Sequence, residues 1–191
     1  MRALRPVILA SLLALAVPAA AQTMPMPVDI QLPLFLKILT YDRSFQYKAR
    51  TAITIGIVYL PGDPASVKAK DDMVANMGRL SDRTIKNLPI RHVVLEFKDV
   101  PSLDKAVKAG RVNVLYVAPG MGEQLAAIMK MSRTYAITTA TGVPEFVQRG
   151  IAVGIGMKAD KKPDILINLP SSRSEGSEFD ASLLRIATVV K

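Results

Sequence analysis

The stretch that decides the fold runs from Ala52 to Pro64 and reads AITIGIVYLPGDP. Its first nine residues are almost continuously apolar and rich in β-branched side chains, which is typical of a strand buried on both faces of a parallel sheet. The Pro-Gly-Asp-Pro that follows stops the strand. Asp63 is placed to cap a helix whose first position is Pro64. The sequence therefore predicts a buried strand that turns directly into a helix.

The same alternation continues on both sides of this stretch. Upstream, apolar residues at helical spacing predict a helix over residues 30–39, with Pro33 in its first turn, and residues 41–50 are expected to form a polar connection. Downstream, strands are predicted at residues 90–97, 112–118, 135–139, 151–157 and 165–169, and helices at 101–110, after 120, at 144–150 and after 177. The last helix is expected to bury Phe179, Leu183, Ile186, Ala187 and Val190.

Strands that alternate with helices predict βαβ units and a parallel sheet. The polar segment 158–164, which contains Pro163, separates two late strands that are expected to form an antiparallel hairpin. We therefore expect a single α/β domain whose mostly parallel sheet is flanked by helices on both faces.

The N-terminus has the pattern of a secretory signal peptide. Arg2 and Arg5 precede an apolar stretch at residues 7–17, and Ala19 and Ala21 provide small side chains before Gln22. Cleavage after Ala21 is expected, so that residues 1–21 are removed and residues 22–191 form the mature domain. The alternative, an uncleaved membrane anchor, is disfavoured because a span needs about 20 apolar residues.

Composition and charge exclude several classes of site. The 191 residues include no Cys and one His, which excludes disulfide scaffolds, thiolate metal centres and sites that need two imidazoles. The net charge of +9 falls to +7 without the signal peptide, which holds two arginines and no acidic residue. This excess is +2, +3 and +2 over residues 22–60, 61–111 and 112–191, so no basic stretch indicates nucleic-acid binding. Weak attraction to an anionic membrane surface or to an acidic partner fits this charge better than nucleic-acid binding does, and a basic protein with no charged partner is the favoured interpretation.

Two loops carry the candidate binding residues. Residues 118–122 (APGMG) follow a predicted strand and precede a helix, so Gly120 and Gly122 could let the backbone approach a ligand, although a plain strand-to-helix turn is the favoured explanation. In the loop after the last predicted strand, Ser171, Ser172 and Arg173 offer two hydroxyls and a guanidinium. Capping boxes formed by Ser172 with Glu175, or by Ser177 with Asp180, are the alternative there. No catalytic residue, metal site or cofactor is predicted.

Several segments resemble the YfiR/HmsC-like family of periplasmic proteins. They are FLKI at 35–38, ITIGIV at 53–58, VLYV at 114–117, GIAVG at 150–154, and PDILINL at 163–169 followed by EGSEFDASLLRIA at 175–187. The resemblance implies an α/β domain similar to one lobe of a periplasmic binding protein, often a dimer, without enzymatic activity. Its best-understood members bind the periplasmic domains of membrane signalling proteins, notably diguanylate cyclases. Some relatives carry cysteine pairs, which this chain lacks, so a disulfide switch is not carried over.

These observations leave two functional readings open. The first is a non-enzymatic periplasmic regulator that binds the extracytoplasmic domain of a membrane signalling protein, with no nucleic-acid partner, and whether it represses or activates is left open. The second is a periplasmic small-ligand binding protein that serves a transporter or a sensor. A secreted hydrolase is disfavoured, because neither a GxSxG elbow nor a recognisable triad is present.

Overall fold

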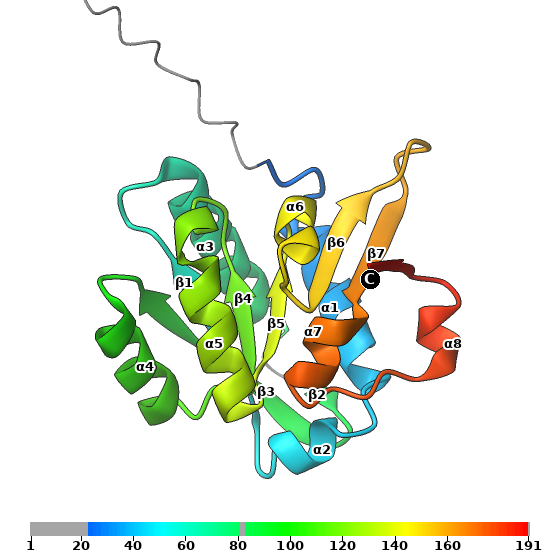
Figure 1. Ribbon diagram of the computed structural model, residues 1–191, viewed down its shortest axis with the longest axis horizontal. Helices are drawn as coiled ribbons and strands as arrows, with labels where there is room; N and C mark the ends of the chain where they lie inside the picture. The colour runs from blue at the N-terminus through cyan, green and yellow to red at the C-terminus, as the bar shows by residue number, and fades with distance from the viewer. Residues whose placement is uncertain (1–22, 81–82, 191) are drawn as a thin grey trace, which may run out of the picture.

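The computed structural model describes residues 23–80 and 83–190, and Figure 1 shows their arrangement as helices around a central twisted sheet. The predicted signal peptide at residues 1–21 lies outside the described residues. Within the described part of the chain, no helix is both long and apolar enough to cross a membrane.

The sheet has eight strands in the order β2-β3-β1-β4-β5-β6-β7-β8. The strands are β1 (Ile53–Tyr59), β2 (Thr84–Ile85), β3 (Leu88–Glu96), β4 (Val114–Val117), β5 (Thr138–Thr141), β6 (Val153–Met157), β7 (Pro163–Asn168) and β8 (Thr188–Val190). Strands β3, β1, β4, β5 and β6 are parallel to one another. Strand β2 is antiparallel to β3 and β7 is antiparallel to β6, whereas β8 is parallel to β7. The predicted mostly parallel sheet and its late hairpin are therefore confirmed.

Helices cover both faces of this sheet, as predicted. The helical segments are α1 (Val28–Thr40), α2 (Phe45–Lys48), α3 (Pro64–Gly78), α4 (Val100–Ala109), the 3₁₀ turn η1 (Gly122–Gln124), α5 (Leu125–Tyr135), α6 (Pro144–Gln148), α7 (Leu169–Ser174) and α8 (Ala181–Leu184). Helices α1 and α3 pack on one face with Ile53, Ile55 and Ile57. Helices α4, α5 and α6 pack on the other face with Val58 and Leu115. Alternate residues of β1 thus serve two cores, which explains why the strand is apolar along nearly its whole length.

The turn after β1 forms as predicted. The Asp63 carboxylate accepts a hydrogen bond of 2.7 Å from the backbone N–H of Ser66, and Pro64 occupies the first turn of α3. This bond satisfies one of the free N–H groups at the start of the helix. It also fixes the direction in which the chain leaves the carboxyl end of β1.

The C-terminal prediction is wrong. Instead of one helix that buries Ile186 and Val190, α8 ends after four residues, and residues 188–190 form β8 at the edge of the sheet. Ile186 is 62% exposed. The β-branched run Thr188-Val189-Val190 favours a strand, and pairing with β7 outweighs the apolar spacing that suggested a helix.

Four further elements differ from expectation. Strand β5 begins at Thr138 rather than at Tyr135, because Ala136 adopts a left-handed conformation (φ 52°) that ends α5. The expected polar connection at 41–50 contains the short helix α2, and α7 follows β7 at once. Helix α1 begins before Ile30, so Pro33 lies inside the helix, beyond the first turn.

Candidate functional site

The carboxyl edge of the sheet is where a ligand site is expected in this topology. Strand β1 has β3 on one side and β4 on the other, so the connections leaving β1 and β4 diverge between these two strands. In open α/β sheets, ligands bind at such a switch point, outside the carboxyl ends of the strands. Here that place lies beyond Tyr59 and Val117, at the upper edge in Figure 1.

The chain's own N-terminal segment packs at this edge. Met26 is buried beside the carboxyl end of the sheet, and its carbonyl accepts a hydrogen bond from the side chain of Gln31, which is fully buried. The hydroxyl of Tyr116, in β4, lies 3.3 Å from the Gln31 Oε1 atom and 3.2 Å from the Met24 sulfur. Burial raises the pKa of Tyr116, so this hydroxyl stays protonated. Side chains of the first described residues and of α1 therefore satisfy the polar groups that a ligand would contact.

The glycines at this edge accommodate side chains of the same chain. A Cβ atom on Gly120, which has a φ of 81°, would lie 2.7 Å from the Asp63 carboxyl carbon. A Cβ atom on Gly142, in the loop after β5, would lie 2.4 Å from the Gln31 amide. The buried Gly122 accepts a hydrogen bond of 2.6 Å at its carbonyl from Arg149. Close backbone approach is real at these positions, but the groups that approach belong to the protein.

The second predicted loop lies at the opposite edge. Strand β7 runs antiparallel to β6, so α7, which carries Ser171, Ser172 and Arg173, lies at the amino edge of the parallel strands. Ser171 and Ser172 are buried, and the Ser172 hydroxyl donates to the carbonyl of Leu169, whereas Arg173 is exposed. The structure therefore does not bring the two predicted groups of residues into one site.

The expected capping boxes do not form. Asn168 caps α7 by accepting a 3.0 Å hydrogen bond from the Ser171 N–H, and Asp180 caps α8 by accepting one of 2.8 Å from the Ser182 N–H. The Glu175 and Ser177 side chains instead point into the protein. Local spacing suggested a cap, whereas the tertiary contacts of both side chains decide their positions.

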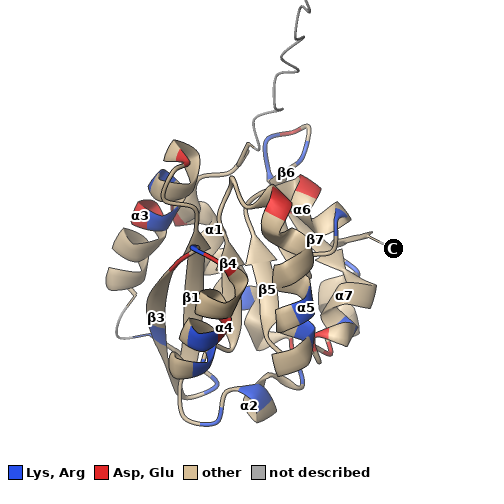
Figure 2. Cartoon of the chain, turned by 60° about the vertical axis from the view of Figure 1, so that its left-hand side comes forward, with Lys and Arg blue, Asp and Glu red and all other residues tan. Residues whose placement is uncertain are grey.

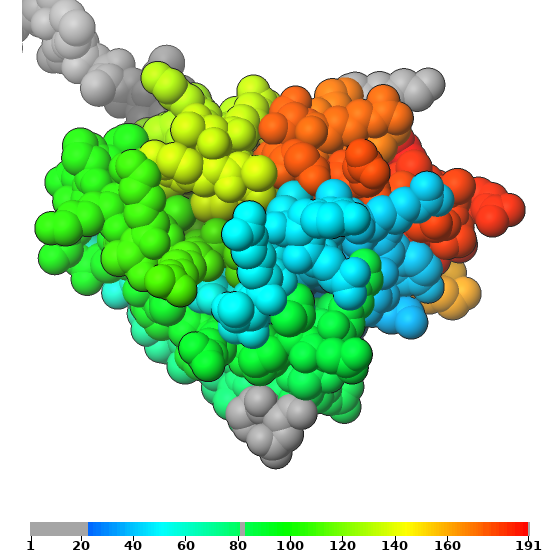
Figure 3. Space-filling view, turned by 90° about the horizontal axis from the view of Figure 1, so that it is seen from below, coloured from blue at the N-terminus to red at the C-terminus, as the bar shows by residue number. Residues whose placement is uncertain are grey.

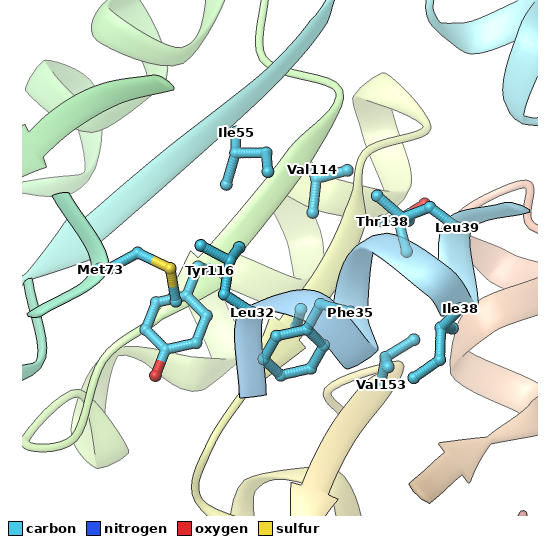
Figure 4. Close-up of a pocket in the computed structure, with 11 residues that line it drawn as sticks. Leu32, Phe35, Ile38, Leu39, Ile55, Met73, Val114, Tyr116, Thr138 and Val153 are labelled. Carbon is cyan, nitrogen blue, oxygen red and sulfur yellow. The ribbon is translucent and has the colours of Figure 1, made fainter. Parts of the chain in front are cut away.

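A small apolar cavity lies between α1 and the sheet, and Figure 4 shows Phe35 and Leu32 facing Tyr116 and Val114 across it. Its volume of about 20 Å³ could hold one water molecule at most, and its lining is almost entirely apolar. This cavity is a packing defect of the core and not a ligand site.

The larger hollows are at the amino edge of the parallel strands, which Figure 3 views from below, with α2 in cyan across the middle. One hollow, of about 550 Å³, lies among the amino ends of β1, β3 and β4 and the end of α4. A second, of about 400 Å³, lies between α2 and the end of α5 and shares Lys48 and Asn113 with the first. The first hollow is within the range of ligand sites, which is roughly 300–1,000 Å³.

The first hollow is strongly basic. Its titratable lining residues are Lys48, Arg50, Arg91, His92 and Arg111. The sequence distributes these cations evenly, but the strand order β3-β1-β4 brings together three segments that are far apart in the chain. In Figure 2, Lys and Arg segments gather along the corresponding lower edge, at β3 and α2.

Behind Lys48 lies a buried polar network that sequence analysis missed. The Lys48 Nζ atom donates to the hydroxyls of Thr138 and Ser177, at 3.0 and 2.7 Å, and lies 3.8 Å from the Asp42 carboxylate. The Glu175 carboxylate accepts hydrogen bonds from the Thr139 N–H at 2.8 Å. The hydroxyls of Thr139 and Ser132 also donate hydrogen bonds to the Glu175 carboxylate, each at 2.8 Å.

Burial shifts the protonation of this network. Desolvation raises the pKa of Glu175 to about 7, although its hydrogen bonds favour the charged form and oppose this shift. Desolvation also lowers the pKa of Lys48. The run of serines and acidic residues at 171–180 was visible in the sequence. Nothing in its spacing indicated that Glu175 and Ser177 would meet β5 and α2.

No group of three or more His, Asp or Glu side chains in the described part of the chain is arranged to hold a metal ion.

The chain matches the YfiR/HmsC-like family over residues 62–188. It belongs to that family. The YfiR/HmsC-like proteins are regulators of periplasmic signalling, and the resemblance seen in the sequence is confirmed. Among curated proteins, none matches this chain.

Solved structures similar to this YfiR/HmsC-like chain have the fold of periplasmic binding proteins. A conserved domain protein from Vibrio cholerae has a TM-score of 0.61 and 18% identity, over 86% of this chain and 60% of its own. A ligand-free, open substrate binding protein with adhesive properties from Clostridium difficile has a TM-score of 0.56 and 17% identity, over 78% of this chain and 57% of its own.

An ABC domain in complex with L-Trp from Streptococcus pneumonia has a TM-score of 0.58 and 11% identity, over 82% of this chain and 59% of its own. The chain thus spans about three fifths of the length of these proteins. At such low identity the likeness shows the fold alone.

Proposed function

We propose that this chain is a non-enzymatic periplasmic regulator that binds the extracytoplasmic domain of a membrane signalling protein, such as a diguanylate cyclase. Its family membership supports a role in periplasmic signalling. To regulate, it must bind one state of the partner more tightly than the other, because equal affinity shifts no equilibrium.

One observation supports a regulator over a small-ligand carrier. The carboxyl edge, where related folds hold ligands, is filled by Met24, Met26 and Gln31 of the same chain. The fold is thus retained while its usual ligand position is closed by the protein's own side chains. Surface recognition of another protein remains open to such a molecule.

The test is affinity capture followed by a direct binding measurement. The mature protein is immobilised, solubilised inner membranes are passed over it, and the extracytoplasmic domain of any signalling protein recovered is then purified. Calorimetry with that domain is expected to show saturable binding, and its addition is expected to change the output of the full-length partner. Recovery of no membrane signalling protein, or a purified domain that does not bind, contradicts the proposal.

A small-ligand binding protein is the second candidate. The hollow of about 550 Å³ and the binding-protein fold of the structural neighbours favour it. A ligand at 100 times its Kd stabilises its protein by ~2.7 kcal/mol, which a thermal-shift screen of amino acids and other metabolites would detect. A panel that produces no shift in Tm removes this candidate.

The cellular form of the protein is part of the same proposal. We expect export, cleavage after Ala21 and a homodimer in solution, as the signal pattern and the family resemblance imply. N-terminal sequencing of the exported protein should begin at Gln22, and sedimentation velocity should give twice the mass of the mature chain. A retained N-terminus or a monomer would contradict the respective part.

A further inference from the structure

The hollow at the amino edge has positive charge that no carboxylate among the described residues neutralises. Arg50, Arg91 and Arg111 all line it, and all three are exposed. The ion pairs found among the described residues involve other cations, on α3, on α4 and in the loop before it, just after α6 and in the β6–β7 hairpin, together with Arg43 and Lys48. Three guanidinium groups thus face one space without a carboxylate partner in the described part of the chain.

The three arginines come from three separate segments of the chain. Arg50 precedes β1, Arg91 is the fourth residue of β3, and Arg111 precedes β4. Because β1 lies between β3 and β4, the three segments enter the sheet next to one another. Arg111 has a φ of 49°, a left-handed conformation uncommon for a residue other than glycine, so the turn between α4 and β4 is tightly constrained.

Acidic groups near the hollow are already engaged. Asp42 and Glu175 are buried behind Lys48, and no Asp or Glu is among the described residues that line either hollow. Asp104, on α4, pairs with Lys108 at 2.7 Å and accepts a hydrogen bond from the Tyr135 hydroxyl. The arginines therefore determine the electrostatic potential at the mouth of the hollow.

Aromatic side chains flank the charge. Tyr47 on α2 is 83% exposed and Tyr135 at the end of α5 is 36% exposed, and both line the second hollow, which shares Lys48 with the first. Exposed tyrosine beside unpaired arginine is the composition found at the centres of protein–protein interfaces. Segments that bind anionic lipid headgroups carry clusters of about four to eight Lys and Arg, more than the exposed arginines that line this hollow.

We propose that this basic hollow, formed by Arg50, Arg91 and Arg111 beside Tyr47, is the docking surface for an acidic segment of the partner's extracytoplasmic domain. The inference rests on the proposed function and adds to it a location and a chemistry. Carboxylates on the partner would form the charge-assisted, bidentate hydrogen bonds that guanidinium groups favour. The tyrosines would pack against the backbone and apolar side chains beside those carboxylates.

The test uses a synthetic peptide of glutamate and tyrosine as the probe, and the same peptide with glutamine in place of glutamate as its control. The intact mature protein is titrated by calorimetry at low and at moderate ionic strength. Arg91→Glu with Arg111→Glu is the test variant. Lys158→Glu with Lys161→Glu, on the β6–β7 hairpin at the opposite edge, makes the same change in net charge. Thermal unfolding confirms that each variant folds, and a triple variant with Arg50, Arg91 and Arg111 changed to Gln replaces the test variant if it does not.

The glutamate peptide is expected to bind more weakly as salt rises, and to lose at least about tenfold in affinity in the arginine variant and less than about twofold in the hairpin variant. No binding, or equal losses in both variants, overturns the proposal. Binding to phosphatidylglycerol vesicles but not to the peptide, lost in the arginine variant, overturns it in favour of a membrane surface.

The same variants separate this inference from the proposed function. If a purified signalling domain binds the wild-type protein and the arginine variant equally, the docking surface is wrong while the proposed function holds. If no signalling protein is recovered but the peptide requires the arginines, the surface holds while the proposed function fails.

Discussion

The ionisation of Glu175 links stability to pH. Its side chain is buried, and the charge of Lys48, which pairs with Asp42, acts on it. Folding raises its pKa from 4.5 to about 7, so the folded state holds the proton more tightly than the unfolded chain does. Stability from this group is therefore fully present below pH 4.5 and is lost as the pH rises to about 7.

The Glu175→Gln variant should remove this dependence. Gln can still accept from the Thr139 N–H and donate to the neighbouring hydroxyls. Wild-type unfolding free energy should fall, on the order of 3 kcal/mol at most, between pH 4.5 and 7, since one pKa unit corresponds to about 1.36 kcal/mol. Urea unfolding across this range measures both proteins, and parallel curves for the two would contradict the assignment.

A substitution at Gly142 tests whether the Gln31 side chain closes the carboxyl edge of the sheet. In Gly142→Ala the new methyl group would lie 2.4 Å from the Gln31 amide, so the side chain must move and the free energy of unfolding should fall by about 2 kcal/mol. Gly78→Ala, in α3, has nothing within 4 Å of its Cβ and should be unchanged or more stable by ~0.5–1 kcal/mol. Equal denaturation midpoints for the two variants would show that the edge is open.

The C-terminal segment forms strand β8 where its apolar spacing predicted a continued helix. Two substitutions distinguish the strand from that helix. Leu183 on α8 is 1% exposed, so Leu183→Ala should cost ~2–5 kcal/mol, whereas Ile186→Ala should change stability by less than about 0.5 kcal/mol. A continued helix would bury both side chains. Similar losses in the two variants, measured by thermal unfolding, would favour that helix over β8.

Elements with strong local signals were predictable, and elements decided by pairing were not. The β1 run and the Asp63-Pro64 helix start carry their structure in neighbouring residues, so they were predicted closely. Strand β8 depends on an edge that β7 offers, and β5 depends on where Ala136 ends α5. The pairing of β8 is set by a strand about 20 residues earlier, and the left-handed turn at Ala136 is a local conformation that its residue type does not favour, so periodicity detects neither.

At the scale of the whole molecule, the candidate site was the least predictable part. Arg50, Arg91 and Arg111 are separated by tens of residues, and only the strand order β3-β1-β4 makes them neighbours. The two loops expected to bind a ligand do follow strands, β4 and β7. Because β7 runs antiparallel to β6, these loops lie at opposite edges of the sheet. The packing of residues 24–26, which precede α1, at the carboxyl edge was not predicted.

The N-terminal segment should therefore behave as part of the core. Met26 is 4% exposed, and Met26→Ala should lower the free energy of unfolding by ~2–5 kcal/mol. Met157→Ala, at the exposed end of β6, serves as the matched control and should have little effect. If both variants unfold at the wild-type denaturant concentration, the segment does not contribute to the fold.

The contact between the α1–α2 loop and the C-terminal segment has a consequence for the order in which the chain can fold. The Asp42 carboxylate accepts from the Glu178 N–H across 136 residues, and Arg43 pairs with Asp180 across 137. Closing a loop of that length is entropically unfavourable until the intervening sheet exists. During synthesis the α1–α2 loop therefore stays without these two partners until residues 178–180 have been made.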